Sequence, residues 1–379
     1  MNDISKYLLL FAIGMVATYL ATPVVEKVSL ALGLVDVPEK RKVHREPVPR
    51  LGGVAIFFGF LVALGFQILA ERYLPWQRGI LSADPELAGI LLAAAIIFGL
   101  GVIDDIRDIS PPTKLAGQLG AGVVVLAFGV SIEFIGNPFG AGGLLYLGVW
   151  SIPLTLFWMT GFANTVNFID GLDGLAAGVC AISGATFFVF AVQTGQTTAA
   201  TLSAVFVAVC IGFLKHNFHP ARIIMGDSGS MFLGFMLGAI AIQGVMKSIA
   251  AIALLVPILI MGVPIFDTAF AIARRMKNRQ PITGADRGHI HHRLLHKGFS
   301  HRLTVIVIYI WSGLLAAAGW SLKFAPSTVK YSILGVLAAL SFLMLKTMGI
   351  FQGLRRSLRL NGRGAGEARP VEKADTNED

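Results

Sequence analysis

Charged residues are scarce in this sequence. Aspartate, glutamate, lysine and arginine make up only 14% of its 379 residues, whereas hydrophobic residues make up 55% and the mean hydropathy is +0.72. Soluble domains are about one quarter charged. The composition therefore excludes a soluble globular protein and indicates an integral membrane protein.

Cysteine is scarcer still. The two cysteines, Cys180 and Cys210, fall inside apolar segments rather than in polar loops. This placement argues against a disulfide framework and a cysteine-based metal site, and we expect buried free thiols. The basic residues also lack an aromatic platform on which bases could stack, so we expect no nucleic acid partner.

Long apolar runs, in contrast, are abundant. A helix needs about 20 apolar residues to cross a ~30 Å hydrocarbon core, and we count about eleven such runs. We therefore predict an all-α integral membrane protein with a single polytopic domain over residues 1–351. The expected spans are residues 7–25, 51–70, 87–103, 115–135, 148–166, 174–192, 197–214, 230–246, 249–272, 303–321 and 328–350.

Lysine and arginine gather in alternate loops. They concentrate after the first and ninth expected spans and in the C-terminal tail, and are scattered elsewhere. The positive-inside rule then places the N-terminus outside and the C-terminus in the cytoplasm. The net charge of +9 thus suits anionic lipid and anionic substrates at the inner face. We further expect a short outer β-hairpin near residues 131–147 and a disordered cytoplasmic tail at residues 352–379.

Five aspartates stand at the ends of expected spans, and in this topology all emerge on the cytoplasmic side. They are Asp104, Asp105, Asp170, Asp173 and Asp227. A carboxylate at a membrane boundary is costly unless it meets water, a cation or a partner. Their convergence predicts a cation-assisted site for an anionic substrate.

Two clusters contain the first four of these acids. Asp104 and Asp105 precede Lys114, and one acid could bind a cation or a basic group while its neighbour orients it. A solvated helix end is the alternative. Asn164, Asn167 and Asp170 or Asp173 recur at three-residue spacing, which aligns amides and carboxylates along one side of a helix end. A helix end needs one capping residue, so this second cluster favours a ligand site.

Two further clusters lie later in the chain. A polar stretch that includes Asn217 leads into Gly226-Asp227-Ser228-Gly229-Ser230, which is either a plain helix N-cap or a site for Mg²⁺ and phosphate. Three histidines and an arginine follow closely at His289, His291, His292 and Arg293. Zinc lacks supporting ligand spacing there, so phosphate binding fits better. His44, His296 and His301 are interpreted as solvated loop residues.

Taken together, these motifs make residues 33–303 resemble the polyprenyl-phosphate N-acetylhexosamine-1-phosphate transferases. The motifs are, in order, Asp36-x-Pro38-x-x-Arg41-Lys42-x-His44, Pro49-Arg50-x-Gly52-Gly53, Asp104-Asp105, Asn164-x-x-Asn167-x-x-Asp170-Gly-x-Asp173-Gly, Met225-Gly-Asp227-Ser-Gly-Ser, Pro264-x-x-Asp267 and His289-Ile-His291-His292-Arg293.

The resemblance implies transfer of a sugar 1-phosphate from a UDP-sugar to undecaprenyl phosphate at the inner face of a bacterial cell membrane, with release of UMP. It implies Mg²⁺, or alternatively Mn²⁺, on Asp227 and Asn167, and uracil at Asp173. Asp104 and Asp105 would then serve the lipid phosphate. The remaining expected substrate-binding residues are Lys114, Asn164, Asp170, Asn217, Asp267, His289, His291, His292 and Arg293.

Rival interpretations remain open at this point. The His-Ile-His-His-Arg form resembles the N-acetylglucosamine branch and departs from the muramyl-pentapeptide phosphotransferases, which are the runner-up. An ion-coupled transporter would need carboxylates near the bilayer midplane and internal repeats, which the sequence does not display. The sequence leaves undecided which N-acetylhexosamine is used, which polymer is started, whether the protein is a homodimer, and whether Asp104 or Asp105 removes a proton.

Overall fold

Helices make up most of the computed structural model of this protein. It describes residues 3–36, 47–73, 84–136, 144–246, 255–277 and 289–322, with a few single positions from 326 to 339. The chain divides into two units, residues 1–330 and 331–379, and the named elements all lie in the first. The expected tail at residues 352–379 lies outside the described residues, as does most of the expected span at 328–350.

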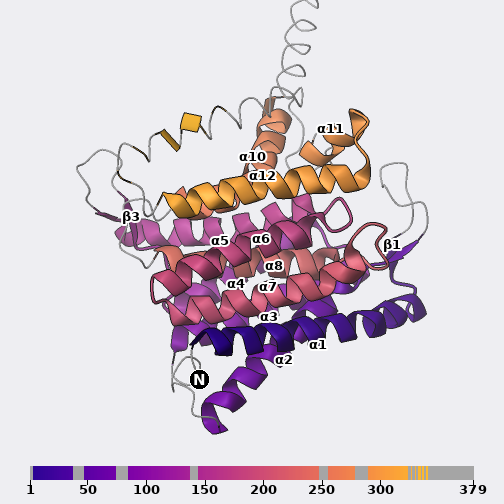
Figure 1. The fold of residues 1–379 in the computed structure, drawn as a ribbon, viewed down its shortest axis with the longest axis horizontal. Coiled ribbons are helices and arrows are strands. Elements are labelled where there is room, and N and C mark those ends of the chain that lie inside the picture. Colours follow the sequence, from indigo (N-terminus) through magenta and orange to yellow (C-terminus); the bar gives the residue numbers. More distant parts are fainter. Residues whose placement is uncertain are drawn as a thin grey trace, which may run out of the picture. The chain divides into compact units, whose positions relative to one another are not determined.

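Most of the helices run alongside one another in Figure 1. Their bounds are α1 (Asp3–Ala31), α2 (Gly52–Tyr73), α3 (Pro85–Arg107), α4 (Pro111–Ala127), α5 (Ser151–Ile169), α6 (Leu175–Gln193), α7 (Thr197–Asn217), α8 (Gly226–Ala241), α9 (Leu255–Ile260), α10 (Gly262–Lys277), α11 (Ile290–His296) and α12 (His301–Ser321). A 3₁₀ turn, Gly148–Trp150, precedes α5, and a π-helical turn, Ile242–Met246, extends α8.

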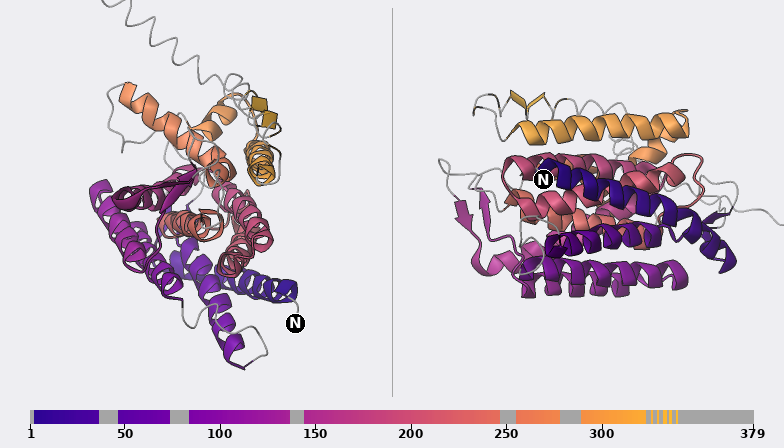
Figure 2. Two further views of the ribbon diagram at one scale, coloured as in Figure 1. Left: turned by 90° about the vertical axis from the view of Figure 1, so that its left-hand side faces the viewer. Right: turned by 60° about the horizontal axis from the view of Figure 1, so that its bottom comes forward.

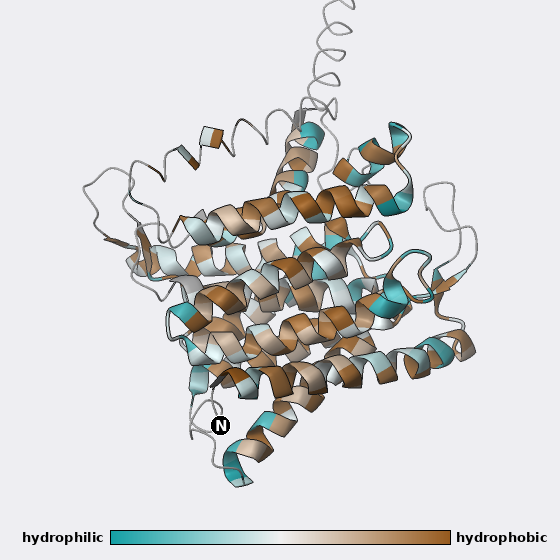
Figure 3. Cartoon of the chain, in the orientation of Figure 1, coloured by the Kyte–Doolittle hydropathy of each residue, from teal (hydrophilic) through white to brown (hydrophobic). Residues whose placement is uncertain are grey.

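Six of the described helices are long and apolar enough to cross a membrane: α1 from Ile4, α2, α3, α6, α7 and α12. Hydrophobic residues extend along them, and hydrophilic residues gather towards their ends (Figure 3). Large apolar side chains such as Leu8, Leu20 and Val24 are exposed on α1, as expected of a lipid-facing helix. The prediction of an all-α, multi-pass membrane protein is confirmed, whereas the number of spans and their orientation stay predictions.

The region expected as one span at residues 249–272 is described from Leu255 as two helices. A turn at Met261 separates α9 from α10, and α10 is steeply inclined to α12 and projects away from the bundle (Figures 1 and 2). Gly262 and Pro264 explain the break, because glycine weakens a helix and proline has no N–H to donate to the preceding turn. The basic loop expected after this span also contains a helix in its described part, α11.

Strands are few and short among the described residues. β1 (Val35–Asp36) pairs antiparallel with β2 (Val48–Pro49) just before α2. β3 (Phe134–Gly136) pairs antiparallel with β4 (Leu144–Tyr146), with Ile135 opposite Leu145. This second pair falls within the segment expected as a hairpin. The connecting turn lies outside the described residues, and its outer location stays a prediction.

Helix α8 forms the centre of the bundle. Every residue from Ser228 to Ala241 is buried, and the helix packs against α2, α3 and α5 (Figure 2). The contact with α5 requires glycine at Gly234, because a Cβ there would lie 2.4 Å from the carbonyl oxygen of Phe162. This close packing brings the first turn of α8, which carries Asp227, to the ends of α3 and α5.

Candidate active site

The first turn of α8 is held by a carboxylate from another helix. Asp105, near the end of α3, accepts hydrogen bonds from the backbone N–H of Asp227 at 2.7 Å and of Ser228 at 3.0 Å. These two N–H groups have no acceptor within α8, so Asp105 serves as its N-cap across the bundle. Gly226 leaves room for this contact, because a Cβ there would lie 2.6 Å from Asp105 Oδ1.

Lys114 joins two of the predicted acids. Its ammonium group forms ion pairs with both Asp104 and Asp227. The other oxygen of Asp104 accepts from the backbone N–H of Ile109 at 2.9 Å, within the short link that returns the chain from α3 to α4. Asp108, in contrast, points outward with 85% of its side chain exposed. Asp104 and Asp108 are one helical turn apart in sequence, yet Asp104 is buried and Asp108 is exposed.

The two asparagines of α5 have different partners. Asn167 donates to Asp227 Oδ1 at 2.8 Å and to Ser230 Oγ at 2.9 Å. Asn164 donates to Gln118 Oε1 at 2.7 Å and so connects α5 with α4. Gln118 was missed from sequence, although it lies one helical turn after Lys114. Asp104, Asp105, Lys114, Asn167 and Asp227 form what we call the acidic cluster.

Asp170 and Asp173 lie in the turn between α5 and α6. Burial, together with the charges of Asp227, Asp105 and Asp173, raises the pKa of Asp170 well above its ordinary value. The charges that raise this pKa thus come both from the acidic cluster and from Asp173. This turn connects the two groups of predicted residues.

Asp173 is buried between two histidines. His219 Nδ1 donates to its Oδ2 at 2.6 Å, and His301 Nε2 lies 4.0 Å from the same oxygen. The two imidazole rings stack with centroids 3.9 Å apart and planes inclined by 14°. We call these three residues the His-Asp-His cluster. The interpretation of His301 as a solvated residue is wrong, because packing of α12 against α6 leaves it only 9% exposed.

The His-Asp-His cluster has three potential ligand atoms within 4.8 Å of one another. Its ring planes are nearly parallel, however, so the in-plane lone pairs of the two imidazoles do not converge on a single point. The geometry therefore favours a hydrogen-bonded unit over a metal site. His219 was missed as a functional candidate, and its only sequence signal was its place two residues after Asn217.

Asn217 and Asp267 both bind backbone groups. Asn217 accepts from the N–H of Gly174 at 3.0 Å and donates to the carbonyl of Ile223 at 2.9 Å, so it ties the turn before α6 to the segment before α8. Asp267 on α10 accepts from His289 Nδ1 at 2.8 Å and from the N–H of Ile290 at 2.8 Å. It thereby caps α11 and fixes the histidine motif.

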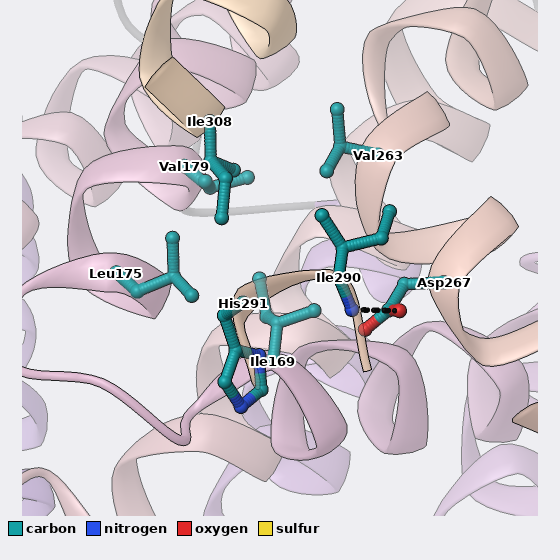
Figure 4. Close-up of a pocket in the computed structure, with 8 residues that line it drawn as sticks. All are labelled: Ile169, Leu175, Val179, Val263, Asp267, Ile290, His291 and Ile308. Atoms are coloured by element: carbon teal, nitrogen blue, oxygen red, sulfur yellow. Dashed lines mark hydrogen bonds between the residues drawn. The ribbon is translucent and has the colours of Figure 1, made fainter. Parts of the chain in front are cut away.

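Helix α11 places His291 against the turn between α5 and α6. A Cβ on Gly171 would lie 2.6 Å from His291 Nε2. Figure 4 shows this ring beside Ile169 at a small, mostly apolar pocket, with the bond from Ile290 to Asp267 nearby. Burial and the neighbouring histidines lower the pKa of His291 well below its ordinary value, so its ring is neutral. His292 and Arg293 lie partly exposed on the same helix.

Carboxylates, a lysine and an amide thus meet at one end of α3, α4, α5 and α8. Carboxylate and amide oxygens are ligands that Mg²⁺ prefers. The acidic cluster already binds one cation, the Lys114 ammonium group, between two carboxylates. Such a site can bind a divalent cation and a phosphorylated ligand. The structure brings together Asp104, Asp105, Lys114, Asn167 and Asp227, and it places Asp173 with the two histidines instead.

Comparison with known proteins supports the same chemistry. Residues 87–245 match the model of glycosyl transferase family 4. The chain is 37% identical, over 90% of its length and 91% of the relative's, to a probable undecaprenyl-phosphate N-acetylglucosaminyl 1-phosphate transferase of Bacillus subtilis.

Two other relatives point the same way. The decaprenyl-phosphate N-acetylglucosaminephosphotransferase of Mycobacterium tuberculosis is 37% identical over 85% of this chain and 84% of its own. The undecaprenyl-phosphate alpha-N-acetylglucosaminyl 1-phosphate transferase of Escherichia coli K12 is 27% identical over 89% and 92%. The chain therefore belongs to glycosyl transferase family 4, among the polyprenyl-phosphate N-acetylglucosamine-1-phosphate transferases.

Proposed function

We propose that this protein transfers N-acetylglucosamine 1-phosphate from UDP-N-acetylglucosamine to undecaprenyl phosphate and releases UMP. The names of its relatives support the sugar phosphate and the polyprenyl acceptor. The observation that carries the proposal is the acidic cluster, in which Lys114 bridges Asp104 and Asp227 beside Asn167. We place the reaction at the cytoplasmic face of a bacterial cell membrane, as the first membrane step of an envelope polysaccharide.

The acidic cluster fits Mg²⁺, with Mn²⁺ as the alternative. Asp227 and Asn167 would hold the ion, because they supply carboxylate and amide oxygens and are already linked to each other at 2.8 Å. When bound, the ion would neutralise charge on the donor pyrophosphate. Asp105 keeps Asp227 in place by capping α8, and Lys114 is close enough to contact a phosphate bound at Asp227.

The reaction forms one phosphorus–oxygen bond and breaks another. An oxygen of the acceptor phosphate attacks the sugar-linked phosphorus, and the bond to UMP breaks. Since the anomeric carbon–oxygen bond stays intact, the anomeric configuration is retained. The second pKa of a phosphate monoester is near ~6, so at neutral pH the acceptor is largely dianionic and a general base is optional. We therefore propose that Asp104 positions Lys114, with which it forms an ion pair, and does not remove a proton.

The donor would extend from the acidic cluster towards Asp173. The charges of both the acidic cluster and Asp173 raise the pKa of Asp170, so we infer that the turn at residues 170–174 would contact the nucleotide. Helix α11 would approach the sugar-phosphate end with His291 and Arg293. Because the His291 ring is neutral, it can offer one N–H to a phosphate oxygen without adding charge.

A donor panel tests this proposal. Purified protein, undecaprenyl phosphate and Mg²⁺ are incubated with UDP-N-acetylglucosamine, UDP-N-acetylgalactosamine or the muramyl-pentapeptide donor, and UMP release is measured. We expect release with the first donor. Release with the muramyl donor alone would instead assign the runner-up activity, and label uptake into proteoliposomes without lipid-linked product would indicate a transporter.

Asp227→Ala provides the matching test of the site. We expect it to abolish UMP release while the protein still inserts and purifies as a folded species. Asp108→Asn is the control, because that side chain is exposed and asparagine tolerates its positive φ of 48°. Full activity of Asp227→Ala at ordinary Mg²⁺ would remove Asp227 from the metal site.

A further inference from the structure

Two histidines next to Asp173 have no part in the reaction described so far. His219 follows α7, and His301 is the first residue of α12. Their rings stack at a centroid distance of 3.9 Å, and His219 donates its Nδ1–H to Asp173 at 2.6 Å. Two helices that are distant in sequence thus meet at one carboxylate.

Side chains of helix α12 also contact the backbone of the turn that carries Asp173. His301 Nε2 lies 3.4 Å from the carbonyl oxygen of Asp173, and the Tyr309 hydroxyl donates to the carbonyl of Gly174. Arg302 Nε also donates to the carbonyl of His219 at 3.2 Å. The start of α12 therefore fixes both the turn that carries Asp173 and the histidine that binds it.

The stacked pair determines where the Asp173 carboxylate can point. Its Oδ2 accepts from His219 at 2.6 Å and from the backbone N–H of Ala221 at 3.1 Å, and the shorter bond comes from the side chain. His301 is buried and covers one face of the His219 ring, so that ring cannot swing away from Asp173 without losing the stack.

We propose that the His219–His301 pair is a positioning unit that holds Asp173 in the orientation needed to bind the nucleotide end of the donor. This inference rests on the proposed function, which puts the nucleotide at the turn of residues 170–174. Lys114 and Asn167 instead contact Asp227, where the proposed function puts the pyrophosphate. Loss of the pair should therefore weaken donor binding in the ground state and the transition state alike, which raises KM and leaves kcat nearly unchanged.

Paired substitutions separate the hydrogen bond from the stack. His219→Leu removes the donor, whereas His219→Asn keeps an N–H donor near the position of Nδ1. His301→Phe keeps a ring on His219 but removes Nε2, and His301→Gln does the reverse. We expect His219→Leu to raise KM for UDP-N-acetylglucosamine about tenfold, equivalent to about 1.4 kcal/mol. Its kcat and its KM for undecaprenyl phosphate should stay within about twofold, and His219→Asn should recover most of the loss.

Inhibition by UMP gives a second measurement that is independent of turnover. UMP contains the nucleotide part of the donor but lacks the N-acetylglucosamine and the second phosphate, so its inhibition constant should rise in parallel with the donor KM. His296→Leu is the matched control, because His296 is exposed on α11. In combination with Asp173→Asn, the His219→Leu effect should largely disappear, since both changes remove the same contact.

The outcomes separate the two proposals. Wild-type protein that releases no UMP with any donor would overturn the proposed function itself. Active wild-type protein with an unchanged donor KM in His219→Leu would overturn the positioning role, and so would a loss confined to kcat or full additivity with Asp173→Asn. If His219→Leu does not fold, as judged by size-exclusion chromatography, the donor KM of His301→Phe and His301→Gln decides the matter: a rise in either supports the role, and wild-type values in both refute it.

Discussion

Replacing Asp105 by alanine should destabilise the protein through helix α8. The change removes two hydrogen bonds, of 2.7 Å and 3.0 Å, that the backbone of α8 donates to a side chain that is only 4% exposed. Removal of the acceptor leaves two backbone N–H groups without a partner, and each unsatisfied donor costs roughly 1–3 kcal/mol. We therefore expect the free energy of unfolding to fall by about 4 kcal/mol.

Asp84→Ala is the matched control for a helix cap. Asp84 caps its own helix, α3, through one bond of 3.1 Å to the N–H of Glu86, and it is partly exposed. Removal of a local cap of this kind costs about 1 kcal/mol. The measurement is unfolding of purified protein in detergent micelles by denaturant titration, followed by tryptophan fluorescence. Equal stability losses in the two variants, or wild-type stability of Asp105→Ala, would refute the argument that Asp105 caps α8.

Three further predictions concern residues around the same site. Lys114→Met should lower the free energy of unfolding by about 2–3 kcal/mol, because it leaves two partly buried carboxylates without their cation. It should also stop UMP release. Lys215 is exposed, so Lys215→Met is the control and should have neither effect. The pKa of His291 is lowered, so below about pH 6.5 the unfolded chain gains a proton that the folded protein excludes. The free energy of unfolding should therefore decrease as the pH is lowered from about 7 to about 5, and His291→Gln should weaken this pH dependence. Gly171→Ala adds a Cβ 2.6 Å from His291 Nε2, so we expect loss of roughly 1–3 kcal/mol of stability together with reduced UMP release, and unaltered denaturation and kinetics would contradict this contact.

The membrane character of the fold could be predicted from sequence because long apolar runs have few alternative structures. The bounds of α2 and α6 lie close to the expected spans at residues 51–70 and 174–192. The break between α9 and α10 was harder to anticipate, because Gly262 and Pro264 lie within an otherwise continuous apolar run. Such residues are common in membrane helices, and only the neighbouring packing decides whether the helix bends or ends.

The acidic residues could be found one by one, but their partners could not. Motif spacing identified Asp105 and Asp227, yet the bond between them depends on how α3 packs against α8. His219 and His301 are 82 residues apart, and no local pattern indicates that their rings stack. Contacts of this type are set by tertiary structure, so a lone histidine before an apolar run looks the same whether it is solvated or buried.

The central position of α8 also bears on how the protein is assembled. The helices that pack most closely against it, α2, α3 and α5, all precede it in the chain, and so do α6 and α7. During synthesis, the helices that surround α8 are therefore made before α8 itself. Asp227 is therefore synthesised only after Asp105 and Lys114, so its partners are already present when α8 packs between the earlier helices.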